Sequence, residues 1–283
     1  MVELVASQYG KSRVRLMKVT RKDGVHELLD WTVEVLVRGE FTAAHVEGDN
    51  SRILATDTMK NMVYSVARSS SATSMEEYAK ELTGLLLERN GQVDSVTVLI
   101  ESALWKRLAT DGRPDPANFM HGSGERQTAE VERFQDGRLR VTSGLTDMVL
   151  LKTANSGFEG FLRDEWTTLK ETSDRLMGTA MRAKWIYVTE DVTYKKARYE
   201  VREAMLATFA RHKSRSVQET LYAMAEAALG SSAAIDEIEI VMPNRHCLLV
   251  DLSRFGQDNP NEIFVPTEDP HGTIEARVRR HRA

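Results

Sequence analysis

Apolar positions in the first seventy residues change their spacing between two stretches. Residues 9–20 and 28–38 are rich in Val, Leu, Trp and Thr, a composition typical of β-strands, and Asp23-Gly24 between them supplies a turn. We therefore expect a long hairpin. From about 57 to 67 the apolar residues recur every three or four positions, which predicts a helix. The apolar residues of this helix are Met59, Met62, Val63 and Val66.

A second helix follows the first closely. It is expected to begin at Ser74, because Ser74-x-x-Glu77 has the spacing of a capping box. Its apolar stripe consists of Tyr78, Leu82, Leu85 and Leu86. Strand character returns over 93–105, and 129–145 predicts another hairpin with its turn at Asp136-Gly137.

The second half of the chain repeats this order of elements. Strands are expected over 148–158 and 182–194, and a helix from about 195 to 212. Another helix begins at Ser216, again with a Glu three residues later. Two further strands, 235–242 and 246–252, are expected on either side of a break at Pro243-Asn244-Arg245.

Each half thus has the order strand, strand, helix, helix, strand, strand. Strands that bracket a helix pair predict an antiparallel sheet with helices on one face, an α+β layer. We expect two tandem domains, 8–148 and 149–283. The second face of each sheet must be covered or polar, which favours assembly of several chains.

Composition excludes several classes of protein. The net charge of -4 over 283 residues argues against a general nucleic-acid binder, which usually carries a basic excess. No apolar run is long enough to span a bilayer. Cys247 is the single cysteine, so no intrachain disulfide forms and a reducing compartment is favoured. With no secretory signal at the start and no peroxisomal address in "RVRRHRA" at the end, a cytoplasmic location is expected.

Motifs for metals and nucleotide cofactors are absent from the sequence. The seven histidines form neither H-x-H nor H-x-x-x-H, and one cysteine makes no zinc pattern. There is no G-x-x-x-x-G-K-[ST] loop and no G-x-G-x-x-G fingerprint. We expect neither a metal nor an organic cofactor.

Two polar groups lie on predicted strands. Side chains of a strand alternate between its two faces, so Lys11, Arg13 and Arg15 are expected on one face. This face is either a solvated edge or part of a cleft in which Lys11 acts as a base. Asn244 and His246 share a face at a turn-to-strand junction. They are either ordinary turn chemistry or an amide and an imidazole that meet one ligand.

Helix starts supply further candidates. Thr56 and Asp57 precede an apolar helix and could cap it or hold a ligand. If Ser216 is an N-cap, the N–H groups of Val217 and Gln218 have no partner within the helix, and the helix dipole favours an anion there. The other interpretation is a well-capped surface helix.

Phe158 supplies a flat aromatic ring, and Arg175 supplies a planar guanidinium whose N–H groups donate hydrogen bonds. Together they could stack on and grip a planar anion. Taken separately, the Phe suits a core and the Arg a solvated helix face.

Five segments together resemble the motifs of the urate oxidase (uricase) family, in the same order and at similar spacing. They are "YGKSRVRLMKV", "ATDTMKNMVY", "TANSGFEGFLRDEWTTLKET", "SVQETLYAMAE" and "MPNRHCLLVDLS". The resemblance runs from about residue 8 to residue 275. It implies the tunnelling fold (T-fold), with two tandem domains per chain and four chains closing into a tunnel-shaped homotetramer. It also implies oxidation of urate by O2 and water to 5-hydroxyisourate and hydrogen peroxide, without a metal or organic cofactor.

The resemblance also implies how urate is held. Arg175 and Gln218 would grip opposite edges of the urate anion, and Phe158 would stack on its plane. The backbone N–H of Val217 would add a donor.

The remaining roles concern proton transfer and oxygen. Thr56 and Asp57 would reach the pocket from a neighbouring chain, Asp57 largely through its main chain. Lys11, Thr56 and His246 would form a proton relay with Lys11 as the base. Asn244 and Thr56 would hold O2 or water above the ring.

Two other functions compete with this one. Another T-fold enzyme acting on a purine or pterin, such as a GTP cyclohydrolase-like hydrolase, generally needs a Cys/His metal site or a different set of acids. A non-catalytic purine-binding oligomer would not need Lys11, Thr56 and His246 together.

Overall fold

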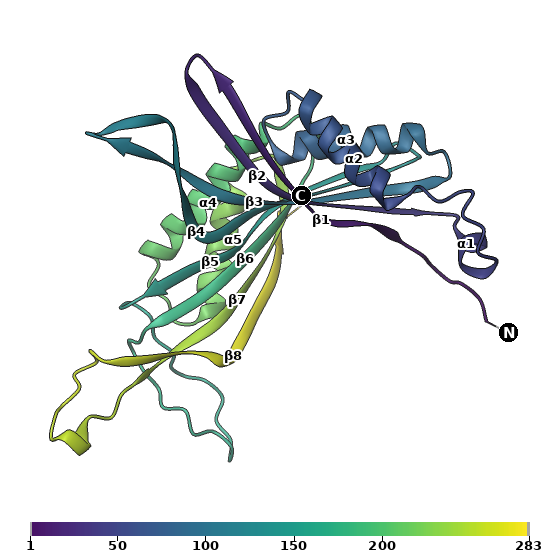
Figure 1. Cartoon of the computed structure of the whole chain (residues 1–283). Helices are drawn as coiled ribbons and strands as arrows, with labels where there is room; N and C mark the ends of the chain where they lie inside the picture. The colour runs from purple at the N-terminus through teal and green to yellow at the C-terminus, as the bar shows by residue number, and fades with distance from the viewer. Residues whose placement is uncertain (1, 282–283) are drawn as a thin grey trace. The chain divides into compact units, whose positions relative to one another are not determined.

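The computed structural model describes residues 2–281, and the chain divides into two compact units between Gly144 and Leu145. Figure 1 shows unit 1 from purple to teal and unit 2 from teal to yellow. The last two residues of the tail, on which the expected lack of a peroxisomal address depends, lie outside the described residues. The domain limits 8–148 and 149–283 stay a prediction.

Unit 1 contains antiparallel strands that pair in chain order. The strands are β1 (Tyr9–Lys22), β2 (Val25–Gly39), β3 (Val93–Thr110) and β4 (Arg113–Phe134). The helices are α1 (Thr42–Val46), α2 (Thr56–Ser69) and α3 (Met75–Arg89). Asp23 and Gly24 turn the first hairpin with φ of 52° and 77°, a region that Gly enters without a steric penalty. The predicted hairpin and helix pair are confirmed.

The core of unit 1 lies between one face of the strands and helices α2 and α3 (Figure 1). The residues that alternate on the buried face of β2 are Val33, Val35 and Val37. The predicted capping box of α3 is present: Ser74 Oγ accepts from the Glu77 N–H, and the Glu77 carboxylate accepts from the Ser74 N–H. The capping-box prediction rested on spacing along one element, and it is confirmed.

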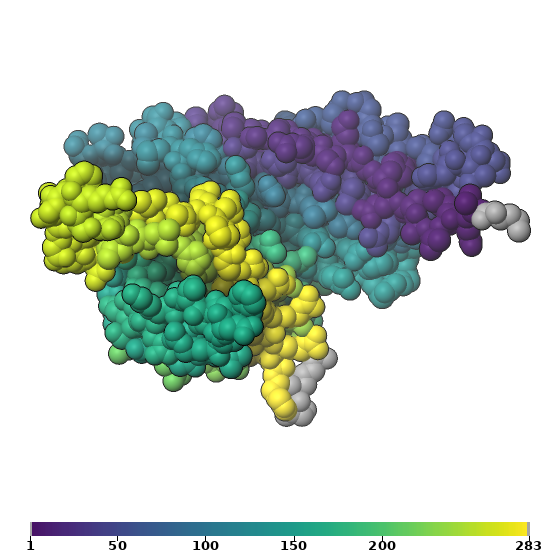
Figure 2. All heavy atoms as spheres, turned by 90° about the horizontal axis from the view of Figure 1, so that it is seen from below, coloured from purple at the N-terminus to yellow at the C-terminus, as the bar shows by residue number. Residues whose placement is uncertain are grey.

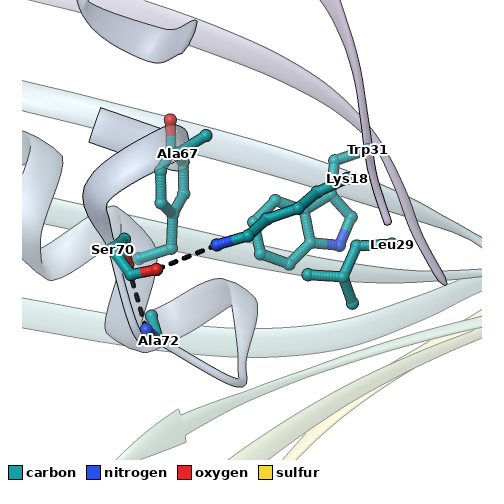
Figure 3. Close-up of a pocket in the computed structure, with 7 residues that line it drawn as sticks. Lys18, Leu29, Trp31, Ala67, Ser70 and Ala72 are labelled. Atoms are coloured by element: carbon teal, nitrogen blue, oxygen red, sulfur yellow. Dashed lines mark hydrogen bonds between the residues drawn. The ribbon is translucent and has the colours of Figure 1, made fainter. Parts of the chain in front are cut away.

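Lys18 of β1 closes the end of α2 (Figure 3). Its Nζ donates to the carbonyl oxygen of Ser70, the C-cap residue, at 2.8 Å. The side chain lies in a small pocket beside Leu29 and Trp31. A cation at a helix C-terminus satisfies free carbonyls and opposes the negative end of the dipole, so this contact fastens α2 to β1.

Lys18→Met is expected to lower the free energy of unfolding by about 1 kcal/mol, because Met keeps the apolar stem but loses the bond to Ser70. Lys22→Met, at the exposed end of the same strand, is the control and should change it by less than about 0.5 kcal/mol. Urea unfolding curves measure both values. Equal stability of Lys18→Met and wild type would show that the contact contributes nothing.

Unit 2 repeats the architecture. Its strands are β5 (Leu139–Lys152), which begins in unit 1, β6 (Met177–Tyr187), β7 (Ile235–Leu249) and β8 (Phe264–Arg279). Its helices are α4 (Tyr194–Arg211), α5 (Val217–Ser231) and the short 3-10 helix η1 (Ser253–Phe255). Strands β6, β7 and β8 pair antiparallel in chain order, and α5 packs on β7 and β8. The α+β prediction of a strand layer with a helix pair holds for both units.

Two strand predictions in unit 2 were too long. The strand expected over 182–194 ends at Tyr187. Thr189 Oγ1 accepts a hydrogen bond from the Asp191 N–H, and this local turn replaces the backbone hydrogen bonds that a continued strand would make. The strand expected over 148–158 ends at Lys152, and a loop of residues 153–176 follows. Within residues 2–281, no helix has both the length and the apolar character needed to cross a membrane.

Candidate active site

Unit 2 contains a cavity of about 190 Å³. Its lining residues are Phe158, Leu169, Arg175, Val217, Gln218, Asn244, His246 and Ile274. They come from the loop 153–176, the start of α5, and strands β7 and β8. In Figure 2 the loop 153–176 (blue-green) and β8 (yellow) border a hollow on the surface of unit 2. Six residues chosen from the sequence therefore meet in one pocket.

The N-terminus of α5 forms one wall of the pocket. Ser216 Oγ accepts from the Glu219 N–H at 3.1 Å, which confirms Ser216 as the N-cap. The Glu219 carboxylate does not close a full capping box, because it accepts from the backbone N–H and the guanidinium of Arg215. The hydrogen bonds of Arg215 lower the pKa of Glu219 to about 2. The N–H groups of Val217 and Gln218, at the first two helical positions, lack helical partners and suit an anion.

The loop 153–176 holds Phe158 and Arg175 together. Phe158 and Thr172 exchange two backbone hydrogen bonds of 2.7 and 3.2 Å, and the Arg175 N–H donates to the Ser156 carbonyl at 2.7 Å. The Arg175 Cζ lies 5.1 Å from the centre of the Phe158 ring. Burial lowers the pKa of the Arg175 guanidinium, and its buried Nε has no hydrogen-bond partner in residues 2–281. A buried guanidinium N–H without a partner suits a ligand that supplies an acceptor.

Asn244 and His246 line the pocket from one face of β7, as period two predicted. The break expected at 243–245 is wrong, because β7 runs unbroken from Ile235 to Leu249. The irregularity lies in β8: Asn244 pairs with Gly272 and His246 with Thr267, so β8 carries three extra residues there. Pro243 is tolerated inside the strand beside this bulge, where the regular ladder is already interrupted.

Thr56 and Asp57 belong to unit 1 and start α2, but they do not cap it with their side chains. The N-cap residue is Ala55, and no side chain accepts from the first turn. The Asp57 carboxylate instead accepts from the side chains of Lys60 and Asn61. The N–H groups of Thr56 and Asp57 therefore lie at the first two helical positions, as those of Val217 and Gln218 do in α5.

Lys11 is also in unit 1, and the prediction that it shares a face with Arg13 and Arg15 is wrong. Lys11 pairs with Val35 and Val14 pairs with Val33, so β1 has one extra residue between them, and Arg13 there has a φ of 57°. Because residues opposite each other in a ladder share a face, this bulge turns Lys11 to the buried face of Val33 and Val35.

Lys11 therefore lies on the side of β1 that faces α2. The pKa of Asp57 is lowered, chiefly by the hydrogen bond and charge of Lys60, and Lys11 contributes a further charge. Gly10 permits the local backbone approach, since a Cβ at this position would lie 1.8 Å from the Val35 carbonyl oxygen. Lys11, Thr56 and Asp57 thus form a second group in unit 1.

Three further residues at the pocket of unit 2 were not found from the sequence. Leu169 and Ile274 supply apolar lining, and Phe161 stacks on Phe158 with ring centres 4.9 Å apart and planes 10° apart. Ile274 could have been found from the period-two pattern of Ile274, Ala276 and Val278 in β8. Leu169 and Phe161 lie in an irregular loop, where no periodicity marks an inward position.

Metal ligands do not gather in the described structure: residues 2–281 contain no cluster of three His, Cys, Asp or Glu side chains suited to a metal ion. Cys247 is half-buried and free. The expectation that no metal takes part stays a prediction.

Comparison with known proteins gives a consistent result. A family model described as "Uricase" matches residues 7–132 and 141–275. The uricase of Arthrobacter globiformis is 39% identical over 279 residues, covering 99% of this chain and 90% of that protein. The uricase of Dictyostelium discoideum is 36% identical over 282 residues, covering 99% of this chain and 98% of that one.

A crystal structure of the Arthrobacter globiformis uricase superimposes with a TM-score of 0.94 at 38% identity, covering 100% of this chain and 97% of that one. The match confirms the T-fold α+β architecture of the single chain. The chain therefore belongs to the uricase family of urate-oxidising enzymes.

Proposed function

We propose that the chain oxidises urate with O2 and water to 5-hydroxyisourate and hydrogen peroxide in the pocket of unit 2, without a metal or organic cofactor. The two electrons that urate loses reduce O2 to peroxide, and water balances the oxygen and hydrogen of the products. The observation that carries the proposal is the meeting of an unpartnered buried guanidinium N–H, a free helix N-terminus and an aromatic ring at one cavity.

Urate is a flat anion, and these groups suit its edges and its face. The Arg175 fork binds one edge, while the Gln218 amide, which both donates and accepts, binds the opposite edge. The Val217 N–H donates at the positive end of the α5 dipole. Phe158, whose ring also stacks with that of Phe161, stacks on the ring plane.

Oxidation requires an electron-rich urate, so a second proton must leave the monoanion. Lys11, Thr56 and His246 form the proton relay, with Lys11 as the base. A cation and neutral donors favour the dianion, and exclusion of water strengthens both effects. Asn244 and Thr56 hold O2 or water above the ring.

The site is completed in a homotetramer, in which Lys11, Thr56 and Asp57 of a neighbouring chain meet the pocket of unit 2. Large apolar side chains of unit 2 that are strongly exposed support this assembly, because such groups favour burial in an interface. They include Leu162, Trp166 and Phe255, which are 92%, 81% and 74% exposed. A cytoplasmic location is part of the proposal and is supported by the single Cys247.

An absorbance assay separates this function from its alternatives. Chelator-treated protein mixed with urate in air is expected to remove the ultraviolet absorbance of urate and to release one hydrogen peroxide per urate. Failure to consume urate after chelation would contradict oxidation without a metal. Binding of urate without consumption would favour the non-catalytic purine binder.

Arg175→Gln is expected to raise the Kd for xanthine, a purine that lacks the 8-oxo group of urate, by roughly 30-fold, because charge-assisted hydrogen bonds contribute about 2 kcal/mol. Lys170→Gln removes one positive charge from the same exposed loop and should leave the Kd within about twofold of wild type. Calorimetric titration measures both. Similar Kd values for the two variants would show that Arg175 acts only through general charge.

A further inference from the structure

Four buried side-chain atoms in residues 2–281 have no hydrogen-bond partner, and all four belong to unit 2. They are Ser156 Oγ, Arg175 Nε, Thr179 Oγ1 and His212 Nε2. A buried polar group without a partner costs about 1–3 kcal/mol, so each needs a physical reason. The proposed ligand accounts for Arg175, and Glu219 lies 3.6 Å from His212 Nε2. Ser156 and Thr179 have no such account, and of the two only Thr179 pairs with a residue that lines the pocket.

Thr179 lies on the buried face of β6 among apolar side chains. The alternating residues Met177, Thr179, Met181, Ala183 and Trp185 are all buried, and Thr179 is 1% exposed. Val would fill this position with the same shape and no unpaired hydroxyl. Packing therefore explains the size of the side chain but not its oxygen.

The register of the strands places Thr179 beside the pocket. Thr179 of β6 pairs directly with Asn244 of β7. Side chains of opposite residues in an antiparallel pair share a face, with Cβ atoms about 4.5–5.5 Å apart. Asn244 lines the cavity, and within residues 2–281 its carboxamide makes no hydrogen bond to protein. The hydroxyl of Thr179 thus lies next to an amide that nothing else orients.

We propose that Thr179 is a positioning residue that sets the orientation of the Asn244 carboxamide; this role rests on the proposed function of Asn244. An amide presents either two donors or an acceptor to a ligand, depending on a half-turn about its last bond. Oxygen that gains electrons in the pocket requires a donor. In this role the Thr179 hydroxyl, which has no partner within residues 2–281, turns to donate to Asn244 Oδ1, and Asn244 Nδ2 then faces the oxygen side of the pocket.

Thr179→Val tests this role because it removes the hydroxyl and keeps the shape. The expected result is a fall in kcat and a rise in the apparent KM for O2, each by roughly tenfold, the effect of one well-placed hydrogen bond. The Kd for xanthine should stay within about twofold of wild type, since Asn244 is assigned to oxygen and not to the purine edges. Thr179→Ser keeps the hydroxyl and should restore wild-type values, whereas Thr179→Ala should reproduce the Val variant.

Thr83→Val is the matched control. Thr83 is fully buried in α3 of unit 1, and its hydroxyl donates to the Lys80 carbonyl at 3.1 Å. This variant is expected to alter stability without changing the KM for O2. A kcat and a KM for O2 that are equal in Thr179→Val and wild type would overturn the positioning role, and so would weaker xanthine binding in Thr179→Val. Failure of the wild-type protein to consume urate would instead overturn the proposed function, and this role with it.

Discussion

Lys11→Met is expected to lower kcat for urate by roughly 10²–10⁴-fold, the range for loss of a general base, while xanthine still binds. Met keeps most of the apolar stem of Lys11 but has no amine to take a proton. The bulge in β1 turns Lys11 to the side of α2, and its charge acts on Asp57, which follows Thr56 at the start of that helix. Because Arg175, Gln218 and Phe158 are untouched, the grip on the purine should remain.

Two measurements separate a lost base from a damaged fold. Loss of urate absorbance gives kcat, and titration with xanthine gives the Kd, which should stay within about threefold of wild type. The residual rate of Lys11→Met is expected to rise with pH, because hydroxide in solution can replace the missing base. Lys18→Met removes a positive charge from the same strand and should keep the wild-type kcat. Turnover of Lys11→Met equal to that of wild type would exclude Lys11 as the base.

Predictions from local spacing succeeded where both partners lie within one helical turn. The hydroxyls of Ser74 and Ser216 each accept from the backbone N–H three residues later. Both partners of the hydrogen bond therefore lie within four consecutive residues of the sequence. Asn244 and His246 share a face as predicted, because β7 continues through the expected break and its side chains keep alternating between the two faces.

Predictions failed where the structure depends on pairing between distant segments. The side of the sheet on which Lys11 lies depends on a bulge in β1 opposite β2. The letters "YGKSRVR" do not reveal the extra residue, which becomes visible only in the pairing with Val33 and Val35. Thr179 was not selected for the same reason, because its relation to Asn244 is a cross-strand register over more than sixty residues. Of the two alternatives for Thr56 and Asp57, side-chain capping is excluded, because Ala55 is the N-cap residue and no side chain accepts from the first turn.

Mixing two variants of lowered activity is expected to restore activity if the site is shared between chains. Lys11→Met keeps the pocket of unit 2, and Arg175→Gln keeps the Lys11 group of unit 1. In hybrids assembled from equal amounts, about one quarter of the sites would combine an intact Lys11 from one chain with an intact Arg175 from another. Differently tagged chains, expressed together and purified through both tags, provide the hybrids, and the rate of urate loss per site measures the restored fraction.

The reverse mixture tests the same geometry independently. Wild type combined with the double variant Lys11→Met/Arg175→Gln places both intact groups in about one half of the sites if each site lies within one chain. If each site uses residues from two chains, only about one quarter of the sites contain both intact groups, because both contributing chains must then be wild type. Activity of the first mixture near zero, together with one-half activity of the second, would rule out sharing. Restored activity in the first and one-quarter activity in the second would assign Lys11 and Arg175 of every working site to different chains, and an isolated chain would then lack turnover even with every residue intact.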